Sequence, residues 1–370
     1  MKRSFIREIL EHTNTNTISF AGGLPNAELF PKEQLKKSAN IILDDSSSLQ
    51  YGNSTGYIQL KEKIALQYCK DGFPTTSANI LITSGSQQAL DIISRYNDSK
   101  KITIEEPSYL GAMNIFYLNK MKIDTVKLKN DGCDINEFKR SIKNSSLAYI
   151  IPDFQNPTGI TYSNDKRKLI ANIIKENDTL LIEDAPYSEI YFKEKYECIS
   201  KHIPSNSYHL GSFSKVLAPS LRIGWIRADE RLLEPLIAYK EAMDLHTNGL
   251  TQFILNDYLK DIELFEQHKE KIRKLYANKL EQFCKYLDEI LPQFEYIKPK
   301  GGMFIYGRLK GINTKELVEK CIKNDVVFVP GIEFYINNSI EDEIRFNFTN
   351  SSSSDIYKGL NIIKNTIEEN

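Results

Sequence analysis

The stretch Gly211-Ser-Phe-Ser-Lys215, followed shortly by Arg222-Ile-Gly-Trp225, decides the fold. Residues 208–213 predict a buried strand, so Lys215 stands where a strand ends, in a loop of small and hydroxyl side chains. A lone lysine usually ends in solvent, and that alternative applies to Lys215 taken by itself. In an open sheet of parallel strands, however, ligands bind at the carboxyl ends of the strands. Lys215 and, seven residues later, Arg222 therefore predict two cations at a binding site.

Short β-rich runs alternate with longer amphipathic stretches around this segment. Continuous apolar strands separated by helices are typical of a mostly parallel sheet covered on both faces, so we predict an α/β fold. The expected strands are 80–83, 102–105, 123–128, 147–151, 180–183, 208–213 and 222–226, and the expected helices are 56–68, 86–96, 108–118 and 166–176.

The pattern changes after about residue 229. Charged amphipathic segments at 229–243 and 260–289 give way to strand-rich runs at 294–307, 326–329 and 343–348, and then to a final helix at 354–368. This pattern predicts a smaller α+β domain. We expect residues 1–44 to form an N-terminal arm that packs with the small domain, 45–245 to form the large domain, and 246–370 to form the small domain.

Two polar segments follow other expected strands. In Ile182-Glu-Asp184-Ala-Pro-Tyr187, an acid at the end of an apolar strand would suit a partly buried cation such as a protonated ring nitrogen. A helix N-cap is an equally good interpretation of Asp184 taken alone. Pro152-Asp-Phe-Gln-Asn156-Pro-Thr-Gly159 predicts a turn, which in isolation would carry no function.

Two further segments favour anionic ligands. Thr83-Ser-Gly85-Ser86-Gln87 predicts a strand that passes through a glycine turn into a helix, where free N–H groups can bind a phosphate. It matches neither GxxxxGKS nor GxGxxG, which disfavours nucleotide binding. Glu343-Ile-Arg345-Phe-Asn-Phe places an arginine in an aromatic-rich strand, and arginine can hold a carboxylate through two parallel hydrogen bonds.

Composition argues against several classes of protein, namely those that bind nucleic acid or lipid, those built on disulfides or zinc, and those that are secreted or span a membrane. A formal net charge of -1 over 370 residues gives no attraction to nucleic acid or anionic lipid. The five cysteines are scattered without a CxxC pair, which argues against a disulfide framework and a structural zinc site, so we expect no metal. The N-terminus lacks the apolar core of a signal peptide, and no apolar run suits a membrane span. A cytoplasmic location is the default expectation.

In this order the motifs resemble pyridoxal-phosphate (PLP) aminotransferases of class I/II, with the aspartate-aminotransferase-like fold. The resemblance is strongest to the subgroup of 2-aminoadipate and kynurenine aminotransferases, which also forms the C-terminal domain of MocR-type regulators. It implies fold type I, with a large PLP domain and a smaller α+β domain. It covers nearly the whole chain, and its further motifs are Ser4-Phe-Ile-Arg7, Ser19-Phe-Ala-Gly-Gly-Leu-Pro25, Tyr51-Gly52, Lys300-Gly-Gly-Met-Phe304 and Val329-Pro-Gly331.

The resemblance implies a role for each site residue. Lys215 holds the cofactor as a Schiff base and shuttles the Cα proton, and Asp184 pairs with the pyridine nitrogen. Arg345 receives the substrate α-carboxylate, in a pocket that also involves Asn156 and the Gly23 backbone. The other implied cofactor contacts are Asn156 and Tyr187 to the phenolic oxygen, Tyr109 stacked on the ring, Ser86, Gln87, Ser212 and Arg222 to the phosphate, and Tyr51 to the phosphate of the neighbouring subunit. Tyr51 thus implies a homodimer with shared sites.

The expected activity is a ping-pong exchange between an amino acid and a 2-oxo acid, with glutamate and 2-oxoglutarate as one pair. Other PLP reactions, namely β-elimination, decarboxylation or racemisation, use the same cofactor-holding residues and stay open. A regulatory PLP-binding module is a third alternative, disfavoured by the near-neutral charge and by the fewer than twenty residues before Ser19. The donor amino acid stays open. Arg7 is either a ligand for an acidic substrate side chain or a solvated arginine.

Overall fold

The structure is a computed structural model, and it describes residues 9, 14–336 and 340–369. Its centre is an eight-stranded sheet in the order β2-β9-β8-β7-β6-β3-β4-β5. The strands are β2 (Ile80–Thr83), β3 (Lys101–Glu106), β4 (Lys122–Lys129), β5 (Gly132–Cys133), β6 (Leu147–Ile150), β7 (Leu180–Asp184), β8 (Ser207–Ser212) and β9 (Gly224–Arg227). Strands β4, β3, β6, β7 and β8 run parallel, whereas β2, β9 and β5 pair antiparallel. The predicted mostly parallel α/β sheet is confirmed.

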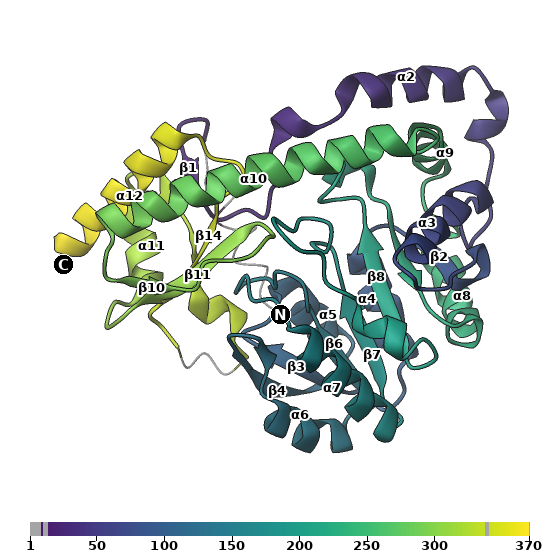
Figure 1. The fold of residues 1–370 in the computed structure, drawn as a ribbon, viewed down its shortest axis with the longest axis horizontal. Coiled ribbons are helices and arrows are strands. Elements are labelled where there is room, and N and C mark those ends of the chain that lie inside the picture. The colour runs from purple at the N-terminus through teal and green to yellow at the C-terminus, as the bar shows by residue number, and fades with distance from the viewer. Residues whose placement is uncertain (1–8, 10–13, 337–339, 370) are drawn as a thin grey trace.

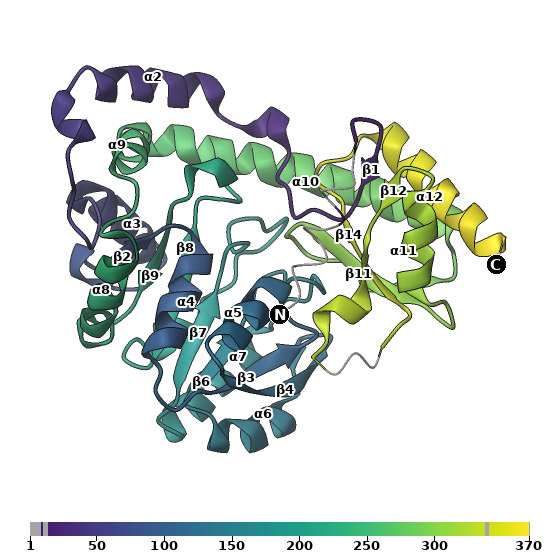
Figure 2. The ribbon, with the colours of Figure 1, turned by 180° about the vertical axis from the view of Figure 1, so that it is seen from behind.

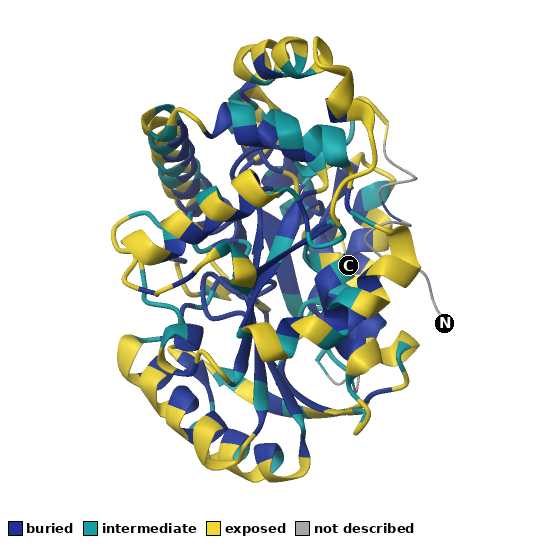
Figure 3. Ribbon diagram, turned by 90° about the vertical axis from the view of Figure 1, so that its right-hand side faces the viewer, coloured by how far each residue is buried: buried dark blue, intermediate teal, exposed yellow. Residues whose placement is uncertain are grey.

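Helices cover both faces of this sheet, because alternate residues of its central strands are apolar on both sides. Tyr149 and Ile182 belong to a core cluster with residues of α4 (Ser86–Tyr96) and α5 (Leu110–Leu118). Ala148 and Leu181 belong to a second cluster with α6 (Ile135–Ser141) and α7 (Asn164–Glu176). Figure 3 shows the buried strands between these layers. Neighbouring residues of β7 therefore point to different sides of the sheet.

A second, antiparallel sheet has the order β10-β11-β14-β13. Its strands are β10 (Phe294–Tyr296), β11 (Phe304–Leu309), β13 (Val329–Pro330) and β14 (Glu343–Asn347). Helices α11 (Thr314–Ile322) and α12 (Ser353–Glu368) lie beside it, and α10 (Ile262–Ile290) runs from this sheet toward α9 (Gly249–Tyr258) (Figures 1 and 2).

The N-terminal segment contacts different parts of the chain along its length. Strand β1 (Ile18–Ser19) pairs with β12 (Val326–Val327) beside the small sheet, whereas α2 (Lys32–Leu43) packs on α9 (Figure 2). The remaining helices of the large part are α3 (Ile58–Lys70) and α8 (Glu230–Asp244). The boundaries near residues 45 and 246 stay a prediction. Within the described part of the chain, no helix has the length and apolar character that a membrane crossing requires.

Two local expectations differ from the structure. The run 294–307 is not one strand: β10 ends at Tyr296 and β11 begins at Phe304, because Pro299 and Gly302, whose φ is +73°, lie between them. Arg222 is not part of β9. It adopts a left-handed conformation with φ 53° after the short 3-10 turn Pro219–Leu221, and the strand begins at Gly224.

Candidate active site

Asp184 is the last residue of β7, and its side chain is buried on the α4–α5 side of the sheet. The Tyr149 hydroxyl donates to its Oδ2 at 2.9 Å, whereas Oδ1 has no hydrogen-bond partner among the described residues. Burial raises the pKa of this carboxyl to about 7, although the hydrogen bond from Tyr149 lowers it. A buried polar atom without a partner is costly, so Oδ1 is an open position for a donor or a cation.

Arg345 lies on β14 of the small sheet and reaches the large sheet through Asn156. Its Nη1 donates to Asn156 Oδ1 at 2.8 Å, and its Nη2 donates to the Ala21 carbonyl. The Asn156 amide in turn donates to the Tyr187 hydroxyl at 3.3 Å. Residues from four distant segments therefore meet around one buried guanidinium.

Two aromatic rings flank the Arg345 guanidinium. Its centre lies 4.3 Å from the Phe304 ring centroid and 5.0 Å from that of Phe334. Burial lowers the Arg345 pKa to about 10, but the group still keeps its charge near neutral pH. Its Nε has no hydrogen-bond partner among the described residues, so the guanidinium retains donor capacity for an anion.

Lys215 follows β8, and its side chain points toward Gly23, next to the Phe304 ring that flanks Arg345. Its Nζ donates to the Gly23 carbonyl at 2.7 Å. A Cβ on Gly23 would come within 3.2 Å of the Phe304 ring and 3.9 Å of Lys215 Nζ, so the backbone approaches closely there. Burial, followed by the charges of Arg345 and Arg222, lowers the Lys215 pKa to about 8. The amine is therefore much closer to neutrality than an ordinary lysine.

A second group of polar atoms lies at the start of α4. Gly85, with φ +81°, precedes the helix, and a Cβ there would come within 2.6 Å of Arg222 Nη2. No described residue accepts a hydrogen bond from the backbone N–H of Ser86 or Gln87. The Tyr109 hydroxyl donates to Gln87 Oε1 at 3.3 Å, so the start of α5 lies beside the first turn of α4.

Ser212 ends β8 between the two groups and caps the lysine loop, because its Oγ accepts from the Ser214 backbone N–H at 3.1 Å. Two predicted residues are not among these contacts. The Tyr51 side chain is exposed, and its ring lies 5.8 Å from the His246 ring. Arg7 lies outside the described residues.

Comparison with known proteins gives the family. The family model for aminotransferase class I and II matches residues 16–363. The chain belongs to the class I and II aminotransferases. Its cofactor is pyridoxal phosphate, and it transfers amino groups between amino acids and 2-oxo acids. This aminotransferase is 34% identical to aromatic-amino-acid aminotransferase 1 of Thermococcus litoralis, over 100% of this chain and 92% of that protein.

Solved structures agree with the family assignment. Pyrococcus horikoshii kynurenine aminotransferase superimposes with a TM-score of 0.93 at 33% identity, over 100% of this aminotransferase and 95% of that chain. The alpha-aminoadipate aminotransferase of Thermus thermophilus, solved with N-(5'-phosphopyridoxyl)-L-leucine, gives 0.92 at 32% identity, over 100% and 95%. The predicted family, fold type and cofactor are thereby confirmed.

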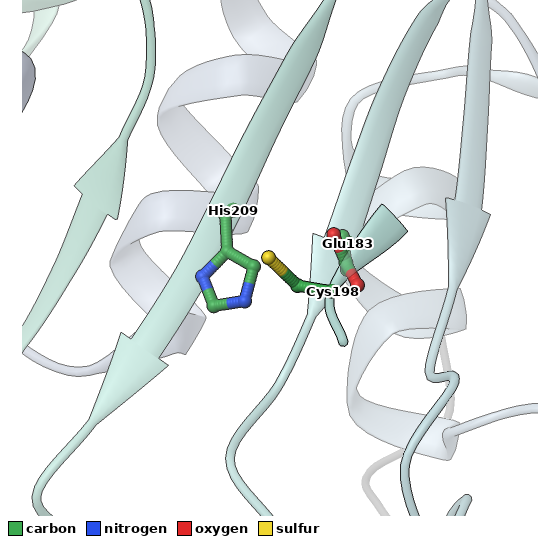
Figure 4. Close-up of side chains that lie close together, drawn as sticks. All are labelled: Glu183, Cys198 and His209. Atoms are coloured by element: carbon green, nitrogen blue, oxygen red, sulfur yellow. The ribbon is translucent and has the colours of Figure 1, made fainter. Parts of the chain in front are cut away.

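A different group of side chains lies on the opposite face of the sheet. Glu183, Cys198 and His209 have potential metal-ligand atoms within 4.8 Å of one another (Figure 4). Glu183 already accepts from the backbone N–H groups of Ile199 at 2.8 Å and Ser200 at 2.7 Å. Cys198 and His209 line a cavity of about 310 Å³, and Ser212 at the end of β8 and Ala185 after β7 belong to the same lining.

Several contributors could not be anticipated from the sequence. Tyr149 looks like an ordinary core residue of β6, and only its position beside Ile182 of β7 shows that its hydroxyl reaches Asp184. Phe304 belonged to a recognised motif, but its contact with Arg345 depends on the pairing of β11 with β14. No local pattern marks either contact.

Proposed function

We propose that this aminotransferase runs a ping-pong exchange with glutamate and 2-oxoglutarate as one pair, as a homodimer with shared active sites, in the cytoplasm. The observation that carries the proposal is the buried Asp184 Oδ1, which no described residue hydrogen-bonds, in the same site as the Lys215 amine and the Arg345 guanidinium. Five unpaired cysteines suit a reducing compartment.

The residues fit the cofactor. Bound PLP supplies an electron-poor ring that draws electrons from the amino-acid Cα. Asp184 Oδ1 would accept from the protonated ring nitrogen, and such a neighbouring cation would favour the ionised form of the buried carboxyl, whose pKa is otherwise raised. Asn156 and Tyr187, which are hydrogen-bonded to each other, would bind the phenolic oxygen of the ring, and Tyr109 would contact the ring.

The phosphate is held where backbone donors and a cation converge. The N–H groups of Ser86 and Gln87 are available at the positive end of α4, and the Arg222 guanidinium lies against Gly85 in the preceding turn. Ser212 adds a hydroxyl. Together these groups give an anion both charge and directed hydrogen bonds.

Arg345 and Lys215 act on the substrate. The guanidinium binds the α-carboxylate, while Asn156 and the Gly23 backbone fix the orientation of the amino acid. Lys215 would hold the cofactor through its Nζ, and as a free amine it would take the proton from the substrate Cα. A pKa near 8 suits this task, because a general base works best when its pKa lies near the working pH.

The second subunit covers an apolar surface. The segment around Tyr51 exposes an unusual density of large apolar side chains: Ile41, Leu43, Leu49, Tyr51 and Ile58. Tyr51 itself is 79% exposed, and its partner-facing role would bring its hydroxyl to the phosphate of the neighbouring subunit. Large exposed apolar side chains gathered in one segment favour a protein partner over solvent.

The donor is tested with a panel built from the substrates named for the relatives, namely aromatic amino acids, 2-aminoadipate and kynurenine. Each donor is mixed with the PLP-loaded enzyme, first alone and then with 2-oxoglutarate. We expect one 2-oxo acid per active site without acceptor and sustained glutamate formation with it, since the two half reactions share one site. Sustained product formation without any acceptor would contradict transamination and favour an elimination or decarboxylation.

A further inference from the structure

Asp244, the last residue of α8, lies against the turn that opens α4. Its Oδ2 accepts from Gln88 Nε2 at 2.8 Å and from Ser84 Oγ at 3.3 Å, and its Oδ1 accepts from Lys240 Nζ. Ser84 and Gln88 stand on either side of Gly85, Ser86 and Gln87. A carboxylate from a helix more than 140 residues along the chain therefore holds both ends of this turn.

Ser84, which Asp244 holds through its Oγ, also contacts Arg222. Its backbone N–H donates to Gln88 Oε1 at 2.8 Å, and its carbonyl accepts from Arg222 Nη2 at 2.9 Å. With Oγ on Asp244, all three polar groups of Ser84 are engaged. The orientation of the guanidinium and of the first N–H groups of α4 thus depends on one serine, and the serine depends on Asp244.

The charges around Asp244 suit a neighbouring anion. An isolated carboxylate here would repel a phosphate, but the side chain of Lys240 is fully buried and pairs with Asp244. Burial lowers the Lys240 pKa, and the ion pair opposes that shift. Although burial raises the Asp244 pKa, hydrogen bonds from Lys240, Gln88 and Ser84 hold it below its ordinary value. The pair supplies fixed hydrogen-bond acceptors with no net charge.

We propose that Asp244, neutralised by Lys240, is a positioning residue for the cofactor phosphate, acting through Ser84, Gln88 and Arg222. This inference rests on the proposed phosphate site at Ser86 and Arg222. It assigns Asp244 no contact with substrate or cofactor. Its effect is on how well the donors are preorganised for a phosphate dianion.

The test compares PLP with pyridoxal, which lacks the phosphate. Full-length protein freed of cofactor is titrated with each compound, and the dissociation constant is read from the absorbance of the bound ligand. For Asp244→Asn we expect the PLP dissociation constant to rise about tenfold, because hydrogen bonds from Gln88 and Ser84 to a neutral amide oxygen are weaker than those to a carboxylate, while the pyridoxal constant stays unchanged. A purely structural role would weaken both ligands equally, and that result would overturn the proposal.

A second variant guards against misfolding. Asp244→Asn leaves the buried Lys240 uncompensated, so Gln88→Leu is tested beside it: this variant breaks the same link and keeps the ion pair. It should show the same phosphate-selective loss. Asp91→Asn is the matched control, because Asp91 lies on α4 with Gln88 and, like Asp244, accepts from two side chains, Arg95 and Asn119, but away from the turn. It should leave the ratio of the two constants unchanged.

Arg222→Met separates this inference from the proposed function. If Arg222→Met abolishes the preference for PLP over pyridoxal while Asp244→Asn and Gln88→Leu keep it, the role of Asp244 is refuted and the phosphate site stands. If Arg222→Met keeps the full preference, the phosphate site itself is misplaced and the proposal for Asp244 falls with it.

Discussion

Replacing Asp184 with Asn should make the cofactor-free protein more stable and the enzyme nearly inactive. Burial raises the folded-state pKa of Asp184 from its ordinary value of 3.8 to about 7. Because the folded value lies above the unfolded one, the native protein binds this proton more tightly, and the stability it contributes is lost as pH rises from about 4 to about 7. Three pKa units at 1.36 kcal/mol each put the cost of the ionised carboxylate at about 4 kcal/mol above pH 7.

The asparagine side chain removes this charge at a smaller cost. It still accepts from Tyr149, but it buries an amide N–H₂ without a partner, which costs about 1–3 kcal/mol. Near pH 8 the free energy of unfolding of the variant, measured by urea denaturation, should therefore exceed that of the wild type by about 1–3 kcal/mol. Near pH 5 the variant should show no such advantage. Tyr149→Phe is the control: without its hydrogen bond the Asp184 pKa rises further, so stability should fall more steeply with pH.

Activity should change in the opposite direction. Losing a buried charge partner costs about 3–5 kcal/mol, which corresponds to a fall of about 10²–10⁴-fold in kcat/KM for the PLP-loaded Asp184→Asn variant. Two results would refute the reasoning: a cofactor-free variant less stable than the wild type at both pH values, or a loss of activity below about tenfold.

Three other substitutions test the remaining roles. Lys215→Ala should leave PLP binding weakened but detectable by absorbance, while transamination nearly vanishes; sustained turnover would remove Lys215 from the chemistry. Arg345→Lys keeps a charge but loses the forked donor and its place between two rings, so kcat/KM for amino acids should fall about 10–100-fold, mainly through KM. Arg7→Ala should raise KM selectively for dicarboxylic substrates, and an equal loss for phenylalanine or leucine would falsify distal recognition by Arg7.

The large sheet could be predicted because its strands are short apolar runs separated by amphipathic helices, and β2 and α4 begin and end where the pattern expects. The elements after about residue 246 were harder to predict. Helix α9 escaped prediction because its apolar and polar residues follow no strong helical pattern, and its start depends on the Asn248 side chain accepting from the Thr251 N–H. Position in three dimensions, not sequence pattern, decides such short elements.

The site also contains residues that could be predicted from the sequence and residues that could not. Lys215, Asp184 and Asn156 could be chosen because each follows an expected strand, and parallel strands bring their carboxyl ends together. Asp244 could not, since its partners Ser84 and Gln88 meet it only after α8 packs on α4. Its own surroundings in the sequence resemble any charged helix end.

Asn156 links the small sheet to the large sheet at the proposed substrate site. Its carbonyl oxygen accepts from Arg345 of the small sheet and its amide donates to Tyr187 of the large one, so neither end of the side chain can turn without breaking a bond. In the proposed site, the position of a carboxylate bound by Arg345 is thereby tied to the position of the Tyr187 hydroxyl. A small shift of β14 would move both contacts at once, and since misplacement of reacting groups by about 1 Å can cost about 10²-fold in rate, packing of the small sheet enters directly into catalysis.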